Sequence, residues 1–372
     1  MRREAIVDQN DNLIGIGILE KVTVSPAGLQ ALLQRVGNEP LPMARLAELL
    51  LAMGHDREAH ALCDRAVTLA PDSGEVRAIA ADISSYNVAG WYFPMVRDHH
   101  RHAVIDAAMR RAIRPGSRVL EIGTGTGLFA MMAARAGAAE VVTCDSNPVV
   151  AAVATEIVAR NGYADRVRVI AKSSTDLEVG VDLAEPADVL IWDTLGSTMI
   201  GAGPLPLLES AYRRLLRPGA PAIPARGTIR VALAEYTRAD RWLMQNVEGF
   251  DLSPFNRLAV PGYVLNVDDE RLKLRSEPGD LFDFDFQSGG PFPEGRASVQ
   301  LASAGGAVNG IAQWLRFELD DEGSYENYPA KVPTSVFNVV FYPLSAALEL
   351  EAGIALKVSG SHDRLSLRIW AG

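Results

Sequence analysis

The stretch SRVLEIGTGTGLFAMMAARAGAAEVVTCD, residues 117–145, decides the fold of the region around it. It begins as an apolar β-type run, turns through closely spaced glycines, continues as a helical segment and ends in a second β-type run. Strand–turn–helix alternation continues to about Pro218, with further β-type runs at 167–172 and 187–193. This order predicts an α/β fold with a parallel, doubly wound, Rossmann-like sheet.

The pattern changes on both sides of this region. Residues 225–372 are short β-type runs punctuated by Gly, Pro and Asp, which predicts an antiparallel β-barrel or sandwich. Residues 40–73 have helical periodicity in two blocks. We therefore expect a helical segment at 1–88, a Rossmann-like cofactor-binding domain at 89–224 and a β-barrel substrate domain at 225–372.

The two helical blocks at 40–73 have small residues and a proline at the spacing of a tetratricopeptide repeat. These positions are Ala47, Gly54, Ala59, Ala66 and Pro71. Small residues there allow two antiparallel helices to approach closely, and proline ends the second one. The alternative is an ordinary helical hairpin.

Composition narrows the classes of function. The chain has 372 residues and a net charge of −10, which argues against a general nucleic-acid binder. Its only cysteines, Cys63 and Cys144, indicate free thiols in a reducing compartment, and no cluster is spaced for zinc. We see neither a signal peptide nor an apolar stretch of membrane length, so we expect a cytoplasmic protein without membrane or metal partners.

The glycine turn after the first strand predicts a nucleotide-type cofactor. Gly123, Gly125 and Gly127 are spaced GxGxG, Glu121 precedes them within the strand, and Asp145 ends the next strand. Glycines let backbone N–H groups approach a ligand, and a carboxylate can accept hydrogen bonds from both ribose hydroxyls. These features favour S-adenosylmethionine over the alternative, a nicotinamide dinucleotide, whose usual spacing is GxGxxG.

With these residues, the chain resembles the protein arginine methyltransferases, above all the branch whose animal members carry two methyltransferase halves in tandem. The likeness runs from about Trp91 to about Phe255 and is weaker beyond. The segments that carry it are WYFPMVRDHHR, EIGTGTGLFAMMAARAGA, KSSTDLEVG and NVEGFDLSPFN. A tetratricopeptide segment ahead of the catalytic half also occurs in one eukaryotic member of the family.

The resemblance implies roles for individual residues. Arg101 would pair with the methionyl carboxylate of S-adenosylmethionine, the glycines would form the cofactor loop and Asp145 would hold the ribose. Ser174 and Asp176 lie where the family contacts adenine. Arg101 has an alternative as part of a solvated helix start, and the neighbouring histidines at 99, 100 and 102 are better explained as surface or capping residues than as a base or metal ligands.

The acceptor loop departs from the family pattern. The family places two glutamates there to clamp the protonated guanidinium of arginine. In IWDTLGSTMIGAGPL, residues 191–205, the first position is Asp193 and the second is Ala202. The family's Thr-His-Trp signature should lie just before FNVVFYP, where this chain reads VPTSVFN.

Three functions are compatible with this loop. The first is an N-methyltransferase with an altered acceptor, which can be a peptide or small-molecule nitrogen, including that of a guanidine. The second is a protein-arginine methyltransferase with a rearranged site, and the third is a non-catalytic cofactor-binding scaffold. We predict Asp193 as the acceptor-site carboxylate, the alternative being an aspartate that only caps the turn after its strand.

The resemblance also implies a homodimer. Tandem relatives pair two halves within one chain, whereas this chain has one half and keeps RWLMQNVEGFDLSPFNRL where the family's dimerisation arm lies. Trp242, Leu243 and Phe250 are the residues expected to be buried against a second copy.

Overall fold

The fold was analysed in a computed structural model, which describes residues 4–7, 13–17, 26–86, 88, 90–201, 203–239, 243–329 and 335–372. The chain forms two compact units. One comprises residues 1–93 with 147–153, and the other comprises 94–146 with 154–372. Within the described residues, no helix is both long and apolar enough to span a membrane.

The first unit is a small bundle of helices with a strand pair. Its elements are β1 (Glu4–Val7), β2 (Leu13–Gly17), α1 (Pro26–Val36), α2 (Pro40–Ala52), α3 (Asp56–Leu69) and α4 (Gly74–Ser85). The small side chains of Ala47, Ala59 and Ala66 are completely buried in the core that α2, α3 and α4 share. The expected helices are present, and their assignment to a tetratricopeptide repeat stays a prediction.

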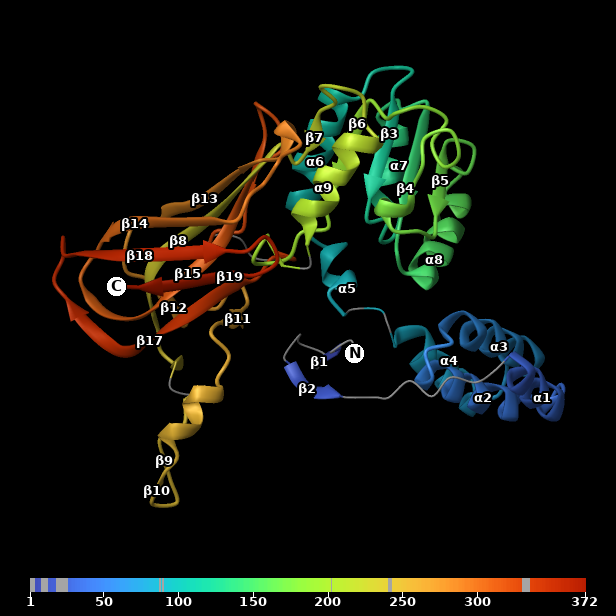
Figure 1. The fold of residues 1–372 in the computed structure, drawn as a ribbon, viewed down its shortest axis with the longest axis horizontal. Coiled ribbons are helices and arrows are strands. Elements are labelled where there is room, and N and C mark those ends of the chain that lie inside the picture. The colour runs from blue at the N-terminus through green and yellow to red at the C-terminus, as the bar shows by residue number, and fades with distance from the viewer. Residues whose placement is uncertain are drawn as a thin grey trace. The chain divides into compact units, whose positions relative to one another are not determined.

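The second unit contains the predicted parallel sheet with helices beside it (Figure 1). The strand order is β5-β4-β3-β6-β7, so the chain reverses direction across the sheet after β5, as in doubly wound folds. The strands are β3 (Arg118–Ile122), β4 (Glu140–Cys144), β5 (Val167–Ile170), β6 (Val189–Trp192) and β7 (Ala222–Ile223). Its helices are α6 (His99–Ala112), α7 (Leu128–Arg135) and α9 (Pro204–Arg214). The residues of α5 (Tyr92–Met95) and of α8 (Pro148–Arg160) are divided between the two units.

The apolar composition of its strands explains why the parallel sheet is buried. Its strands β3, β4 and β6 are almost continuous apolar runs, which suits strands covered on both faces. Trp192, at the end of β6, is fully buried and its indole N–H donates to the carbonyl of Pro224 at 3.2 Å. This bond ties the sheet to the start of the domain that follows.

The residues after 225 form the expected antiparallel β domain. A larger sheet has the order β11-β17-β15-β8-β12, with β13 also paired to β8 and β16 to β15, and a smaller sheet has the order β14-β18-β19. The bounds are β8 (Arg226–Tyr236), β11 (Tyr263–Leu265), β12 (Leu272–Leu274), β13 (Gly279–Asp285), β14 (Gly295–Ala302), β15 (Gly306–Glu318), β16 (Ser324–Glu326), β17 (Val339–Leu350), β18 (Ala355–His362) and β19 (Leu367–Ala371).

One hydrophobic core joins the parallel sheet and the β domain. It includes Leu120 of β3 and Ile191 of β6 together with Leu315 of β15 and Val358 of β18. Burial of this extent makes the two domains one packed body rather than two bodies on a linker. The carboxyl edge of the parallel sheet is therefore held in a fixed relation to the β domain.

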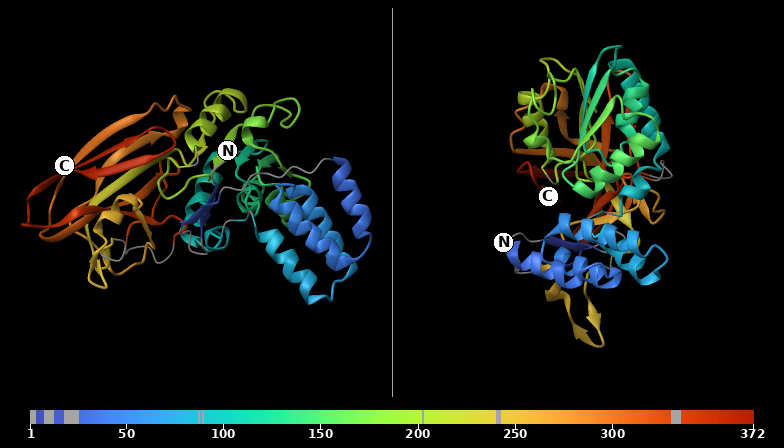
Figure 2. Two further views of the ribbon diagram at one scale, coloured as in Figure 1. Left: turned by 60° about the horizontal axis from the view of Figure 1, so that its bottom comes forward. Right: turned by 90° about the vertical axis from the view of Figure 1, so that its right-hand side faces the viewer.

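An arm leaves the β domain between β8 and β11. It consists of the hairpin β9 (Asn246–Val247) and β10 (Phe250–Asp251), followed by the 3-10 helix η3 (Ser253–Leu258). Figures 1 and 2 show the hairpin projecting away from the β sheets. Of the arm residues named above, Leu243 is half-buried and Phe250 is exposed, while Trp242 lies outside the described residues.

Candidate functional site

The carboxyl edge of the parallel sheet gathers the residues on which the cofactor prediction depends. Ile122 at the end of β3 pairs with Cys144 of β4 and with Trp192 of β6. The residues that follow these three, Gly123, Asp145 and Asp193, therefore leave the sheet at the same level. In doubly wound folds ligands bind at this edge.

The glycine loop is tightly folded against its neighbours. Gly123, Gly125 and Gly127 have φ angles of 91°, 50° and 76°, in the left-handed region that favours glycine. A Cβ atom on Gly123 would lie 2.8 Å from the methyl group of Thr194. The loop is also tied to β4, because the Gly125 N–H donates to the Asp145 carboxylate at 3.2 Å.

Arg101 is buried beside this edge. Asp98 caps α6, since its carboxylate accepts the backbone N–H of Arg101 at 3.0 Å. The Arg101 guanidinium donates through Nη1 to Asp193 and through Nη2 to the carbonyl of Met95 at 3.5 Å. It also lies over the ring of Phe129, 5.3 Å from the centroid.

The structure thus brings two predicted residues into direct contact. We expected Arg101 to face the methionyl carboxylate and Asp193 to face the acceptor, and the observed ion pair joins the two. An arginine has five N–H donors in a planar fork. In the described structure the Nε of Arg101 is buried without a hydrogen-bond partner.

Glu121 is a carboxyl group buried within β3. Burial raises its carboxyl pKa to about 8, and the charges of Asp193 and Asp145 act in the same direction, while a hydrogen bond with Thr143 opposes the shift. One carboxyl oxygen, Oε2, is buried and has no partner within the described part of the chain. The raised pKa favours the neutral form of Glu121, so this carboxyl adds little negative charge to the edge.

The two adenine candidates lie on the segment after β5. This segment starts at the same edge, because the Asp145 N–H donates to the carbonyl of Ile170 at 3.1 Å. Ser174 is buried and Asp176 is exposed, both in the 3-10 helix η1 (Ser174–Asp176). Arg214 of α9 holds η1 by donating to the carbonyl of Thr175 within it at 2.7 Å and to the carbonyl of Leu177 just after it at 2.5 Å. Contact of either side chain with adenine stays a prediction.

The acceptor loop is fastened to the β domain. Downstream of Asp193, the Ser197 carbonyl accepts from the Gln313 amide at 3.0 Å, and the Ser197 hydroxyl accepts from the Asn338 N–H at 2.9 Å. Gln313 lies in β15 and is completely buried. Ala202 occupies the position of the second glutamate in the family that this chain resembles. It lies outside the described residues.

Sequence reasoning missed three functional candidates: Asp98, Gln313 and Tyr325. Asp98 had a signal, because an aspartate just before a helical run is a typical N-cap. Gln313 and Tyr325 had none, since each is a polar residue in a β-type run whose partner is more than a hundred residues away.

The histidines beside Arg101 show no sign of metal ligation. His102 packs edge-on against Phe129, and burial followed by the charge of Arg101 lowers its pKa. His100 lies beside the ring of Tyr325. Across the described residues, no group of three His, Cys, Asp or Glu side chains is arranged to hold a metal ion.

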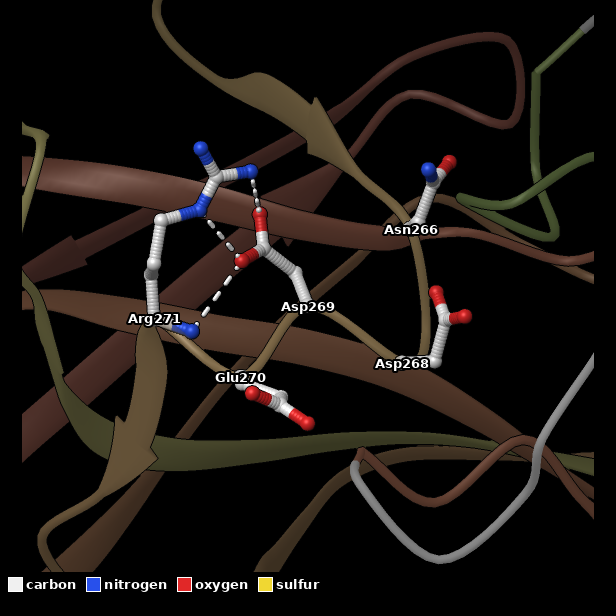
Figure 3. Close-up of a pocket in the computed structure, with 5 residues that line it drawn as sticks. All are labelled: Asn266, Asp268, Asp269, Glu270 and Arg271. Carbon is white, nitrogen blue, oxygen red and sulfur yellow. Dashed lines mark hydrogen bonds and ion pairs between the residues drawn. The ribbon is translucent and has the colours of Figure 1, made fainter.

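A separate depression lies in the turn between β11 and β12 (Figure 3). Its lining residues are Asn266, Asp268, Asp269, Glu270 and Arg271. Asp269 is already paired, since Arg271 donates to both of its oxygens at 2.7 and 2.8 Å and the Tyr236 hydroxyl at 3.1 Å. The depression contains none of the residues at the carboxyl edge of the parallel sheet, so we do not assign the cofactor to this depression.

Comparison with known proteins agrees with this geometry. Residues 101–222 match the family model of ribosomal protein L11 methyltransferase (PrmA). The arginine N(omega)-methyltransferase of Streptomyces achromogenes subsp. streptozoticus is 33% identical over 323 residues, which are 84% of this chain and 88% of that protein. The chain belongs to the arginine methyltransferase family.

Other relatives match over a part of their length. Protein arginine N-methyltransferase 7 of Drosophila grimshawi is 36% identical over 62% of this chain, which spans 36% of that protein. Among solved structures, the Trypanosoma brucei PRMT1 enzyme–prozyme complex with AdoHcy superposes with a TM-score of 0.66 at 22% identity, covering 77% of this chain and 98% of that chain. This last likeness shows the shared fold.

The residues at the edge fit S-adenosylmethionine, the cofactor of this family. Three buried polar atoms without a partner in the described structure gather here, namely Arg101 Nε, Glu121 Oε2 and Thr194 Oγ1. Such atoms are costly unless something pairs with them. Together with the glycine loop and the Asp145 carboxylate, they form a donor and acceptor set for a polar cofactor. This arginine methyltransferase homologue is an S-adenosylmethionine-dependent methyltransferase.

The close contact at Gly123 gives the first prediction. We expect Gly123→Ala to weaken binding of S-adenosylhomocysteine about tenfold or more, because the new methyl group would push the loop away from Thr194. The matched control is Gly137→Ala, at a φ of 114° with nothing within 4 Å of the added Cβ. Calorimetry should show an unchanged affinity for the control, and equal losses in both variants would contradict this assignment of the loop.

Proposed function

We propose that this enzyme transfers the methyl group of S-adenosylmethionine to a guanidino nitrogen of free arginine. The observation that carries the proposal is Asp193, which leaves the sheet level with the glycine loop and is held there by Arg101. Support comes from the Streptomyces relative, whose name specifies arginine and which this chain matches over most of its length.

Asp193 has the properties that a guanidinium site requires. Its side chain is 15% exposed, so it is mostly desolvated and still reachable. A carboxylate can accept two parallel hydrogen bonds from one edge of a guanidinium, which orients the planar group. S-adenosylmethionine supplies an electrophilic methyl group, so the task of the protein is alignment and exclusion of water.

Because the second glutamate of the family pattern is absent, other groups must balance the positive charge of a bound guanidinium. The raised pKa of Glu121 favours its neutral form, so the charged carboxylates that follow the strands at this edge are Asp193 and Asp145. Asp145 is engaged by the glycine loop and Asp193 by Arg101 through Oδ2, and we assign Asp193 to the acceptor side because it opens the acceptor loop. Gln313 Oε1, which is buried without a partner in the described structure, is a neutral acceptor on the side chain that fastens the acceptor loop.

A second candidate function is methylation of arginine within a protein. It is favoured by the likeness to protein arginine N-methyltransferase 7, although this chain spans about a third of that protein. A single carboxylate positions a flexible peptide arginine less tightly than two would. We therefore place free arginine first.

We also propose a homodimer formed through the arm. Large apolar side chains are exposed along it, with Phe250 at 70%, Phe255 at 60% and Leu258 at 73%. Large exposed apolar side chains on one projecting segment favour an interaction site. A second copy of the chain is the partner that the resemblance implies, through an isologous contact.

The acceptor is tested with labelled S-adenosylmethionine and three compounds offered separately. These are L-arginine, a peptide containing arginine, and L-citrulline, which has nearly the same shape with a neutral urea. We expect label in L-arginine and none in L-citrulline, because the urea lacks the charge that pairs with Asp193. Label confined to the peptide would support the second candidate, and no transfer to any guanidine would refute both.

Light scattering at micromolar concentration tests the dimer. Wild type should have twice the mass of one chain, and replacing Phe250, Phe255 and Leu258 by serine should yield monomers because the buried apolar contact is lost. The control is Val181→Ser, which changes a side chain that is 69% exposed and lies outside the arm. A monomeric wild type, or a dimer unaffected by the triple change, would contradict the proposal.

A further inference from the structure

A tyrosine of the β domain reaches the helix cap beside the cofactor edge. Tyr325, in β16, donates its hydroxyl hydrogen bond to Asp98 Oδ2 at 2.6 Å. Both residues are almost fully buried, at 2% and 1% exposure. The Tyr325 hydroxyl also shares a hydrogen bond of 2.7 Å with the hydroxyl of Ser335.

Asp98 in turn engages Arg101 in two ways. Its Oδ1 accepts the backbone N–H of Arg101, and its Oδ2 lies 3.9 Å from the guanidinium Nε. Arg101 then contacts Asp193. A continuous polar chain, buried at Tyr325, Asp98 and Arg101 and half-buried at both ends, therefore runs from Ser335 of the β domain to the acceptor-side carboxylate of Asp193.

Because this series of polar residues is largely buried, the geometry of its hydrogen bonds is tightly constrained. In a low-dielectric interior each polar contact is strong, and an unpaired member is costly. Burial also raises the pKa of the Tyr325 hydroxyl, so it remains a donor throughout the working pH range. Its donated bond directs Asp98 Oδ2, and Asp98 limits the orientations open to the Arg101 fork.

We propose that Tyr325 is a positioning residue that acts through Asp98 to aim the Arg101 guanidinium at the carboxylate of the cofactor. This inference rests on the cofactor role proposed for Arg101. It gives the β domain a part in binding the methyl donor, S-adenosylmethionine. Tyr325 contacts neither the glycine loop nor Asp193 in the bonds described above, so its effect must pass through Asp98.

The competing explanation is that Tyr325 only fills the core. Its ring packs beside Phe337 and His100, and Tyr325→Phe retains the ring while removing the hydroxyl. A matched control is Tyr236→Phe. Tyr236 is a tyrosine of the β domain that is just as buried, and its hydroxyl also donates to an aspartate, Asp269, at 3.1 Å.

The test compares two ligands that differ in the carboxylate. S-adenosylhomocysteine has the amino-acid end that Arg101 would hold, and methylthioadenosine lacks it. In Tyr325→Phe we expect the affinity for S-adenosylhomocysteine to fall about tenfold, the loss typical of one hydrogen bond to a charged group, with methylthioadenosine changed less than about twofold. Tyr236→Phe should change neither.

Two results would overturn the inference. One is an equal loss for both ligands in Tyr325→Phe, which a structural role predicts, and the other is no loss for either. Because these are binding measurements, failure to methylate arginine would leave their outcome untouched. A double variant tests whether the effect of Tyr325 passes through Asp98. Adding Tyr325→Phe to Asp98→Asn should weaken the binding of S-adenosylhomocysteine no further than Asp98→Asn does alone. Additive losses of affinity would contradict this route.

Discussion

The buried ion pair between Arg101 and Asp193 is the constraint on which the site depends. It joins α6 to the end of β6, and the Arg101 side chain is 3% exposed. Placing a guanidinium in such surroundings is expensive, and removal of its partner typically destabilises a protein by about 3–5 kcal/mol. The neighbouring structure is arranged around this charge, with Asp98 at the helix cap, the Met95 carbonyl below the fork and the Phe129 ring at its face.

The carboxyl edge of the parallel sheet holds only a limited amount of negative charge. Burial, followed by the nearby charges of Asp193 and Asp145, raises the pKa of the Glu121 carboxyl to about 8. Its pKa in the folded state is above the unfolded value. Its contribution to stability is therefore lost as the pH rises from the ordinary carboxyl range through about 8. A neutral Glu121 leaves Asp193 as the one carboxylate of this group that faces the acceptor loop, so guanidinium binding depends on a single charge rather than on a clamp.

The sequence predicted the elements that local patterns specify. Apolar runs ending at Gly123, Asp145 and Asp193 placed the strands of the sheet, and the family likeness is shown by relatives. The pairing of Arg101 with Asp193 could not be read locally, because the two are 92 residues apart and each had a separate expected partner. Tyr325 was missed for a related reason, since one tyrosine in a β-type run looks like core until its hydroxyl is seen to reach Asp98 across 227 residues.

The central claim is that Asp193 orients a guanidinium beside the methyl donor. Calorimetric titration of L-arginine into the protein saturated with S-adenosylhomocysteine measures this most directly, with Asp193→Asn as the comparison. We expect the substitution to weaken arginine about thirtyfold or more, because a desolvated charge pair loses one partner. Asp193→Asn that binds arginine as tightly as wild type, in a protein that still binds S-adenosylhomocysteine, would contradict the account.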